Sequence, residues 1–204
     1  MNADGTGEGI PVAAKTPRAR LMQSPRARLT GAVYLTYFLT AIVAQILGSR
    51  KLVMAGDAVN LIAYAFYITL TVLLYWLFKP VSRSISLVAA VFSLAGCLIG
   101  VLDIFHRAPA QVNALWFFGP YCVLLGYLIL RSTLLPRAIG VLMVLAGLGW
   151  LGYLSPTVAR HLTVVIEGLG VVAEASLMLW LLVKGVDEEK WRAQAAGEVR
   201  SEPR

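Results

Sequence analysis

Long apolar runs separated by short polar gaps fill the chain between Leu29 and Val183. The strands of an outer-membrane barrel would alternate apolar and polar residues over about ten positions, whereas Val141–Ala146 is apolar at every position. A helix that crosses a bilayer needs roughly 17–25 residues with few charges. The pattern therefore predicts membrane-spanning helices rather than strands.

Six segments are long and apolar enough to span a bilayer. They are Leu29–Gly48, Ala58–Phe78, Ser84–Phe105, Val112–Leu130, Ala138–Leu154 and Leu162–Val183. Lys79 and Pro80 end the second segment, because proline cannot continue a helix, and Pro120 is expected to kink the fourth. The predicted fold class is an all-α, polytopic membrane bundle of six transmembrane helices.

Composition supports this interpretation and sets the domain limits. The chain has 204 residues, of which 58% are apolar and 14% charged, whereas soluble domains carry about 25% charged residues. Residues 29–183 form the predicted membrane domain, between a disordered basic tail at 1–28 and a charged tail at 184–204. The net charge of +7 would indicate nucleic acid in a soluble chain. In this chain the basic residues belong to loops and tails, so no nucleic-acid partner is expected.

The distribution of basic residues predicts the orientation. Lys and Arg accumulate in short cytoplasmic loops, and six spans place 14 of the 18 on the side of the two tails. The other side has only Arg50, Lys51, Arg107 and Arg160. Both termini are therefore predicted to be cytoplasmic, in a multi-pass protein of the bacterial cytoplasmic membrane. A cleaved signal peptide at the first span is the less favoured alternative, because an h-region usually has only 7–15 residues.

Each tail suggests one further expectation. The N-terminal tail contains a near-repeat, Thr16–Arg20 and Ser24–Arg28, which could contact anionic lipids or simply fix the topology. The C-terminal tail contains Asp187–Arg192, which is compatible with a short interfacial helix that places Trp191 at headgroup depth. A solvated stub is an equally good interpretation of this segment.

Ionisable residues inside a membrane segment are costly and therefore candidates for function. Asp103 lies near the outer end of the third span, and Glu167 and Glu174 lie seven residues apart on one face of the sixth. Glu174 has no Lys or Arg at its predicted depth, so we expect it to be largely neutral or bonded to a hydroxyl or amide. Its function would be to carry a proton in a transport path. The alternative is an interhelical hydrogen bond. Candidate partners are Tyr34, Tyr37, Gln45, Asn60, Tyr64, Tyr67, Ser93 and Tyr121.

An outer-face cluster of His106 and His161 with Asp103 is a weaker candidate. His106 follows Asp103 at a usable helical spacing. Two histidines in the whole chain are, however, too few for a membrane hydrolase site or for paired haem ligands. No metal and no cofactor are therefore expected, and no catalytic residue is assigned. Cys97 and Cys122 lie inside spans and are interpreted as buried free thiols.

Several longer motifs resemble a known family. They are Arg28–Leu35, Leu73–Ser84, Gly126–Arg137, Ile139–Gly147 and Glu174–Val186. Together they are similar to a bacterial multi-pass family catalogued as domain of unknown function family 4386. The resemblance covers about residues 28–192 and implies six spans with an intact first helix. It matches Glu174 to an acidic position of the closing motif, and it implies no reaction.

Two classes of function remain after these exclusions, and an enzyme is the least favoured third. The first class is a small transporter or permeation protein that uses Glu174, with Glu167 as a second candidate group. The second is a non-catalytic membrane component that binds lipid or a partner protein. A polar cavity that reaches Glu174 would favour the first class, whereas a dry interior packed by glycine would favour the second. Gly96 and Gly100, four residues apart, are expected at a helix–helix contact.

Overall fold

The computed structural model describes residues 25–109 and 112–201, and the regular elements within them are helices. In chain order they are α1 (Pro25–Ser49), α2 (Val53–Phe78), α3 (Arg83–Ile104), α4 (Leu115–Arg131), α5 (Arg137–Leu151), the short 3-10 helix η2 (Gly152–Leu154), α6 (Pro156–Val183) and α7 (Glu188–Ser201). The all-α class predicted from the sequence is confirmed.

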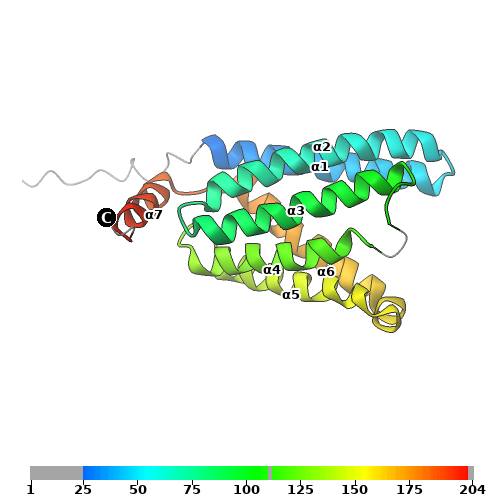
Figure 1. Ribbon diagram of the computed structural model, residues 1–204. Helices are drawn as coiled ribbons and strands as arrows, with labels where there is room; N and C mark the ends of the chain where they lie inside the picture. Colours follow the sequence, from blue (N-terminus) through cyan, green and yellow to red (C-terminus); the bar gives the residue numbers. More distant parts are fainter. Residues whose placement is uncertain (1–24, 110–111, 202–204) are drawn as a thin grey trace, which may run out of the picture.

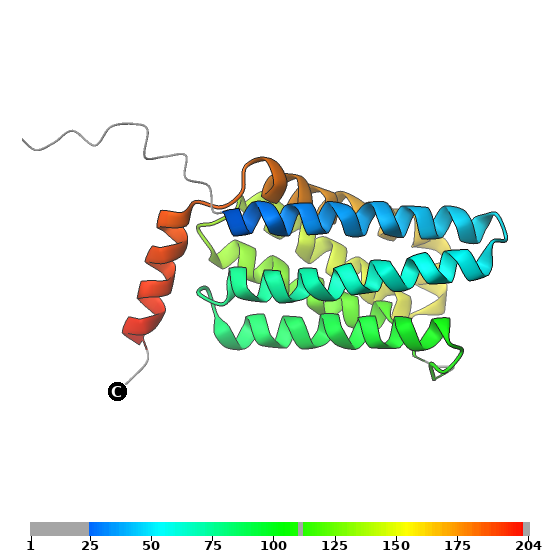
Figure 2. The same cartoon turned by 90° about the horizontal axis from the view of Figure 1, so that it is seen from above.

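The six long helices pack in chain order, and α6 returns against α1 to close a ring (Figures 1 and 2). Successive helices run in opposite directions because the connections between them are short. We call the end of the bundle where α1 begins and α6 ends the tail end. The opposite end, which holds the α1–α2 turn and the start of α6, is the far end.

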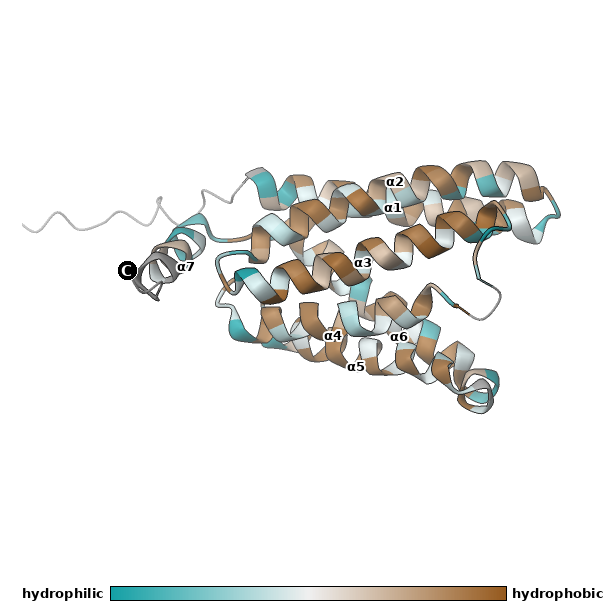
Figure 3. Cartoon of the chain, in the orientation of Figure 1, coloured by the Kyte–Doolittle hydropathy of each residue, from teal (hydrophilic) through white to brown (hydrophobic). Residues whose placement is uncertain are grey.

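The helices of this ring consist largely of apolar residues (Figure 3), and many of these residues are exposed on its outer surface. Met54, Val164 and Val183 are 88%, 84% and 61% exposed, and many other large apolar side chains face outward. Soluble monomers rarely expose contiguous apolar surface of this extent. Five helical segments are long and apolar enough to cross a membrane, and α4 is an apolar helix of 17 residues. These features indicate a membrane protein.

Aromatic side chains at the tail end lie beside basic ones. The Lys79 ammonium lies 4.7 Å from the centre of the Trp76 ring, and the Arg131 guanidinium lies 5.7 Å from that of Tyr127. Trp76 is 57% exposed. Aromatic rings paired with Lys or Arg at helix ends are typical of the membrane–water interface.

The helices differ from the predicted spans mainly at their ends. The predicted tail 1–28 lies outside the described residues except for Pro25–Arg28, which form the first turn of α1. Proline is tolerated in a first helical turn, and the Ala27 side chain in that turn is completely buried. Helix α6 begins at Pro156, six residues before its predicted start at Leu162.

The charged tail forms a longer helix than the predicted one, α7, which runs across the tail end of the bundle (Figure 2). The indole nitrogen of Trp191 donates a hydrogen bond of 3.0 Å to the carbonyl oxygen of Leu77, at the end of α2. Val186 is 1% exposed. Trp191 therefore anchors α7 to the bundle, which a solvated stub would not do.

Candidate functional site

A cavity of about 490 Å³ lies in the far half of the bundle and is lined by α1, α2, α5 and α6. Its size falls within the range of pockets that hold small molecules. Its lining combines aromatic, carboxylate and amide side chains with several small residues. The lining residues are Tyr37, Phe38, Ala41, Ile42, Ala44, Gln45, Gly48, Val53, Gly56, Asp57, Asn60, Trp150, Gly170, Val171 and Glu174.

The cavity exists because α1 and α6 meet closely at the tail end and separate toward the far end. At the tail end, a Cβ atom added to Gly31 would lie 2.5 Å from the backbone nitrogen of Leu182. At the far end, a Cβ atom on Gly48 of α1 or on Gly168 of α6 would meet nothing within 4 Å. Figure 1 shows the far ends of α1 and α2 spreading away from those of α5 and α6. Small residues on the separated walls leave the intervening space unfilled.

Two carboxylates lie at different depths of this cavity. Glu174 comes from α6, nine residues before its last residue Val183, and is partly buried. Asp57 comes from the second turn of α2 at the far end. With a rise of 1.5 Å per residue, Asp57 lies roughly 18 Å further from the tail end than Glu174 does. Glu174 is therefore at the floor of the cavity, and Asp57 is near its mouth.

A buried tyrosine hydroxyl near this floor has no hydrogen-bond partner. Tyr34 is completely buried, and its hydroxyl lies within reach of the Glu174 carboxyl. The two groups do not meet in regular hydrogen-bond geometry, so the Tyr34 hydroxyl has no partner. A buried hydroxyl without a partner is costly. The pair is therefore a polar site with unused hydrogen-bonding capacity.

Aromatic rings fill the interior of the bundle beside Glu174, and one of them, Tyr37, also lines the cavity. The ring centres of Tyr37 and Tyr67 lie 4.6 Å apart, and those of Tyr67 and Tyr121 lie 6.3 Å apart. Phe118 packs edge-on against both Tyr67 and Tyr121. The buried hydroxyls of Tyr67 and Tyr121 have no hydrogen-bond partner. We call Tyr34, Tyr37, Tyr67, Phe118 and Tyr121 the aromatic barrier.

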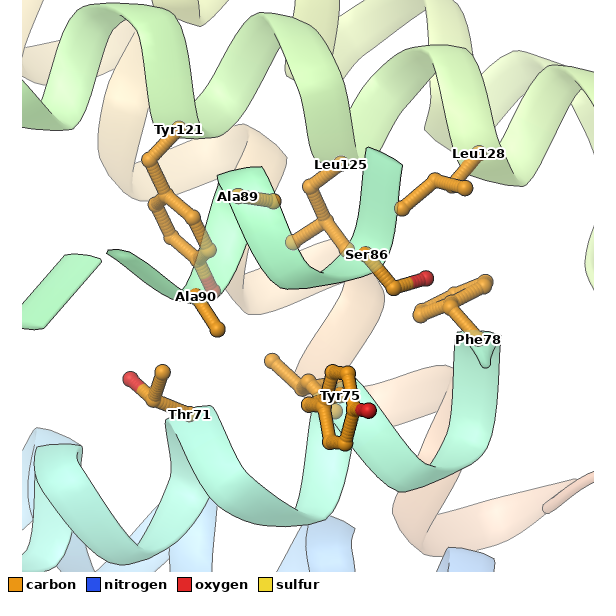
Figure 4. Close-up of a pocket in the computed structure, with 10 residues that line it drawn as sticks. Thr71, Tyr75, Phe78, Ser86, Ala89, Ala90, Tyr121, Leu125 and Leu128 are labelled. Carbon is orange, nitrogen blue, oxygen red and sulfur yellow. The ribbon is translucent and has the colours of Figure 1, made fainter. Parts of the chain in front are cut away.

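A second, much smaller cavity lies on the other side of the barrier, between α2, α3 and α4 (Figure 4). Its volume of about 10 Å³ is close to the space that one water molecule needs. Tyr121 and Ser86 line it, and both have hydroxyls without a partner. Thr71, also in the lining, shares a 2.6 Å hydrogen bond with Ser93 of α3. Unsatisfied polar atoms therefore occur within the barrier and in the lining of the smaller cavity.

The structure places the other predicted site residues outside the cavity lining. Glu167 is exposed on α6, and its carboxylate accepts a 3.1 Å hydrogen bond from the hydroxyl of Tyr153. Asp103 and His106 are exposed at the end of α3 and in the loop after it. His161 is exposed on α6, with its Nδ1 2.9 Å from the carbonyl oxygen of Thr157.

Metal-ligating side chains do not gather in the part of the chain that the structure describes, where no group of three or more His, Cys, Asp or Glu could hold an ion. His106 lies in the loop that follows α3, and His161 lies on α6. Helices α3 and α6 are not neighbours in the ring. Cys97 and Cys122 are buried free thiols.

Sequence reasoning missed Asp57. The predicted second span began at Ala58, so Asp57 was assigned to a loop, whereas α2 begins at Val53 and includes it. The signal was its position one helical turn before Asn60, since residues at this spacing share a helix face. Three of the hydrogen-bond partners that the sequence suggested for Glu174 line the cavity, namely Tyr37, Gln45 and Asn60.

The arrangement of charge defines what this site can do. Two carboxylates contribute to the lining, and none of the described residues that line it is Lys, Arg or His. Amide groups and a phenol add hydrogen-bonding capacity, and Tyr37, Phe38 and Trp150 add aromatic surface. The cavity can therefore hold a cation, a proton or a polar solute, and it lacks a basic side chain to hold an anion.

Comparisons with known proteins agree with the resemblance inferred from the sequence. Residues 102–185, which include Glu174, match the family model described as Domain of unknown function (DUF4386), which supports the family resemblance over that part of the chain. The chain is also 29% identical over 127 residues to an uncharacterized protein of Archaeoglobus fulgidus, covering 58% of this chain and 76% of that protein. No solved structure matches the chain.

Proposed function

We propose that this DUF4386 protein is a small membrane transport or permeation protein. The far-half cavity admits a small solute or ion, and Glu174 at its floor binds that solute or a proton. The observation that carries the proposal is the cavity of about 490 Å³ with a carboxyl group at its closed end. Ionisable groups at membrane depth that face a cavity commonly mark substrate or proton pathways.

The orientation follows from the charge distribution. Of 18 basic residues, 14 belong to the tail end in the six-span arrangement, and short cytoplasmic loops are rich in Lys and Arg. The cavity then opens toward the outside, and the close contact of α1 with α6 at Gly31 and Leu182 separates its floor from the cytoplasm. The unpartnered tyrosine hydroxyls are the groups that would exchange hydrogen bonds with a solute or proton passing the barrier.

Cysteine labelling tests whether the cavity contains water and on which side it opens. Asn60→Cys should react with a membrane-impermeant methanethiosulfonate reagent added outside intact cells, because Asn60 lines the cavity. The matched control is Ile68→Cys on the same helix, because Ile68 is 40% exposed on the apolar outer surface. The native thiols Cys97 and Cys122 are at most 1% exposed, so the background should be low.

We expect Asn60→Cys to react at least tenfold faster than Ile68→Cys. Equal rates would show that the cavity does not hold water, and the proposal would then fail. Reaction of Asn60→Cys only when the reagent is added to inverted vesicles, whose outer face is the cytoplasmic one, would keep the cavity but reverse the orientation.

The second class, a non-catalytic component that binds lipid or a partner protein, draws support from the α4–α5 hairpin. Its two helices meet through glycines with no space for a ligand between them. That dry packing is what a purely structural role predicts. It does not explain a carboxyl group exposed to a cavity, so we place this class second.

A further inference from the structure

We propose that the cavity selects an organic cation that combines a protonated amine with an aromatic or aliphatic group. This inference rests on the proposed function and names the class of solute that the same site takes. It follows from the juxtaposition of aromatic side chains and carboxylates in a cavity that no basic side chain lines.

Charge complementarity is the first support. Glu174 and Asp57 contribute two carboxyl groups to the lining, and the described lining residues supply no cation to pair with them. A cavity whose ionisable side chains are acidic attracts cations and excludes anions, and a bound cation favours the ionised form of a carboxyl group such as that of Glu174. The nearest basic residues, Arg50 and Lys51, are exposed in the α1–α2 turn beyond the mouth and do not line the cavity.

The aromatic walls distinguish an organic cation from a metal ion. Tyr37 and Phe38 on α1 face the cavity, and Trp150 enters it from α5. Trp and Tyr rings attract ammonium groups through the ring quadrupole, and Trp does so best. A hydrated metal ion gains little from such walls and prefers several oxygen ligands at short range, whereas an alkylammonium gains from both walls and carboxylates.

The position of Trp150 is set by a glycine. A Cβ atom added to Gly170 would lie 2.5 Å from the Trp150 ring, so only glycine at this position lets the indole pack against α6. Gly170 lies one turn before Glu174 on the same helix, and both line the cavity. The indole is therefore fixed close to the acidic floor, which is the arrangement that an aromatic cage for ammonium requires.

A hydrogen-bonding group that the protein does not use lies next to the floor, outside the cavity lining. The completely buried Tyr34 hydroxyl lacks a partner although it lies beside the Glu174 carboxyl. An N–H donor bound to Glu174 at the floor lies next to this pair, and the apolar part of the ligand lies toward Tyr37, Phe38 and Trp150.

Three probes of similar shape test the inference. They are 4-phenylbutylamine, which is cationic at pH 7, 4-phenylbutanol, which is neutral, and 4-phenylbutyrate, which is anionic. Binding to the full chain in detergent is measured by calorimetry, with protein-free micelles as the blank. We expect the amine to bind at least tenfold more tightly than the alcohol, and the carboxylate not to bind measurably.

The matched variants are Glu174→Gln and Glu167→Gln. Glu167 lies on the same helix but is exposed and outside the lining, so Glu167→Gln should bind like wild type. Glu174→Gln should lose at least tenfold in amine affinity and should bind the amine and the alcohol equally. Trp150→Leu, which removes the aromatic wall, should weaken amine binding severalfold even if Glu174→Gln does not fold.

Equal affinity for amine and alcohol in wild type would overturn the inference, as would unchanged amine binding in Glu174→Gln. If the amine shows no preference but Asn60→Cys is labelled rapidly, the organic cation is excluded and a water-filled permeation cavity remains. If Asn60→Cys is also not labelled faster than Ile68→Cys, the proposed function is excluded as well.

Discussion

The two sides of the helix ring use small residues for opposite purposes. Between α4 and α5, glycines face one another: a Cβ atom on Gly126 would lie 2.7 Å from the carbonyl oxygen of Gly140, and one on Gly147 would lie 2.7 Å from that of Gly119. Between α1 and α6 at the far end, Gly48 faces open space. Glycine closes a contact where another backbone approaches, and it leaves a cavity where none does.

The physical reason for the difference lies in the solvent. Helices in a membrane have no hydrophobic drive to associate, so close backbone approach and dispersion contacts hold them together. The α4–α5 hairpin has this approach along its length, and the α1–α6 pair has it only near Gly31 and Leu182. The bundle is thus held closely between α4 and α5 and contains a cavity between α1 and α6 at the far end.

The largest expected effect is the loss of stability on filling the α4–α5 contact. Gly126→Leu would place a side chain against the backbone of α5, where the nearest atoms lie 2.7–2.8 Å from the new Cβ atom. The backbone of α5 cannot move aside as the end of a flexible side chain can. We therefore expect a loss of about 3 kcal/mol or more in the free energy of unfolding. Thermal unfolding in detergent measures it.

The control for this change is Gly168→Leu, at an α6 position where a Cβ atom meets nothing within 4 Å. Helix propensity favours Leu over Gly by up to about 1 kcal/mol, so this variant should be as stable as wild type or slightly more so. Equal stability of Gly126→Leu and Gly168→Leu would contradict the glycine-packed contact.

The next effect concerns the α2–α3 contact, which uses a hydrogen bond rather than glycine pairs. Thr71 and Ser93 share a buried 2.6 Å bond between the helices. Thr71→Val should cost about 1 kcal/mol, the usual size of such a bond between membrane helices. Thr69→Val is the control, because the Thr69 hydroxyl bonds only to Ala65 of its own helix. Chemical denaturation in mixed micelles compares them, and an equal effect of both variants would show that the interhelical bond contributes nothing.

Much of the architecture was predictable from the apolar runs alone. Each long helix was placed, and Gly96 and Gly100 lie at contacts as expected, the first against Phe118 of α4 and the second against Tyr64 of α2. Helix boundaries were less accurate, because a first turn such as Pro25–Arg28 depends on tertiary burial of Ala27. Hydropathy along the sequence does not record that burial.

The candidate site was predictable only in part. Glu174 stands out in the sequence because a carboxyl group in an apolar helix is rare. The cavity around Glu174 could not be predicted from the sequence. Its existence depends on the angle between α1 and α6, and that angle depends on which glycines contact the backbone of a neighbouring helix. Asp57 was missed for a related reason: it lies in an α2 turn that extends beyond the apolar run.

The smallest expected effect on stability, and the closest test of the comparison, is Gly48→Leu. Gly48 lines the cavity, and a Cβ atom there would meet nothing within 4 Å. We expect unfolding to change by less than about 1 kcal/mol, in contrast to Gly126→Leu. The added side chain should nevertheless occupy the mouth and slow labelling of Asn60→Cys by severalfold in the double variant. A large loss of stability would mean that α1 and α6 close against each other in the membrane, and unchanged labelling would mean that the reagent reaches Asn60 by another route.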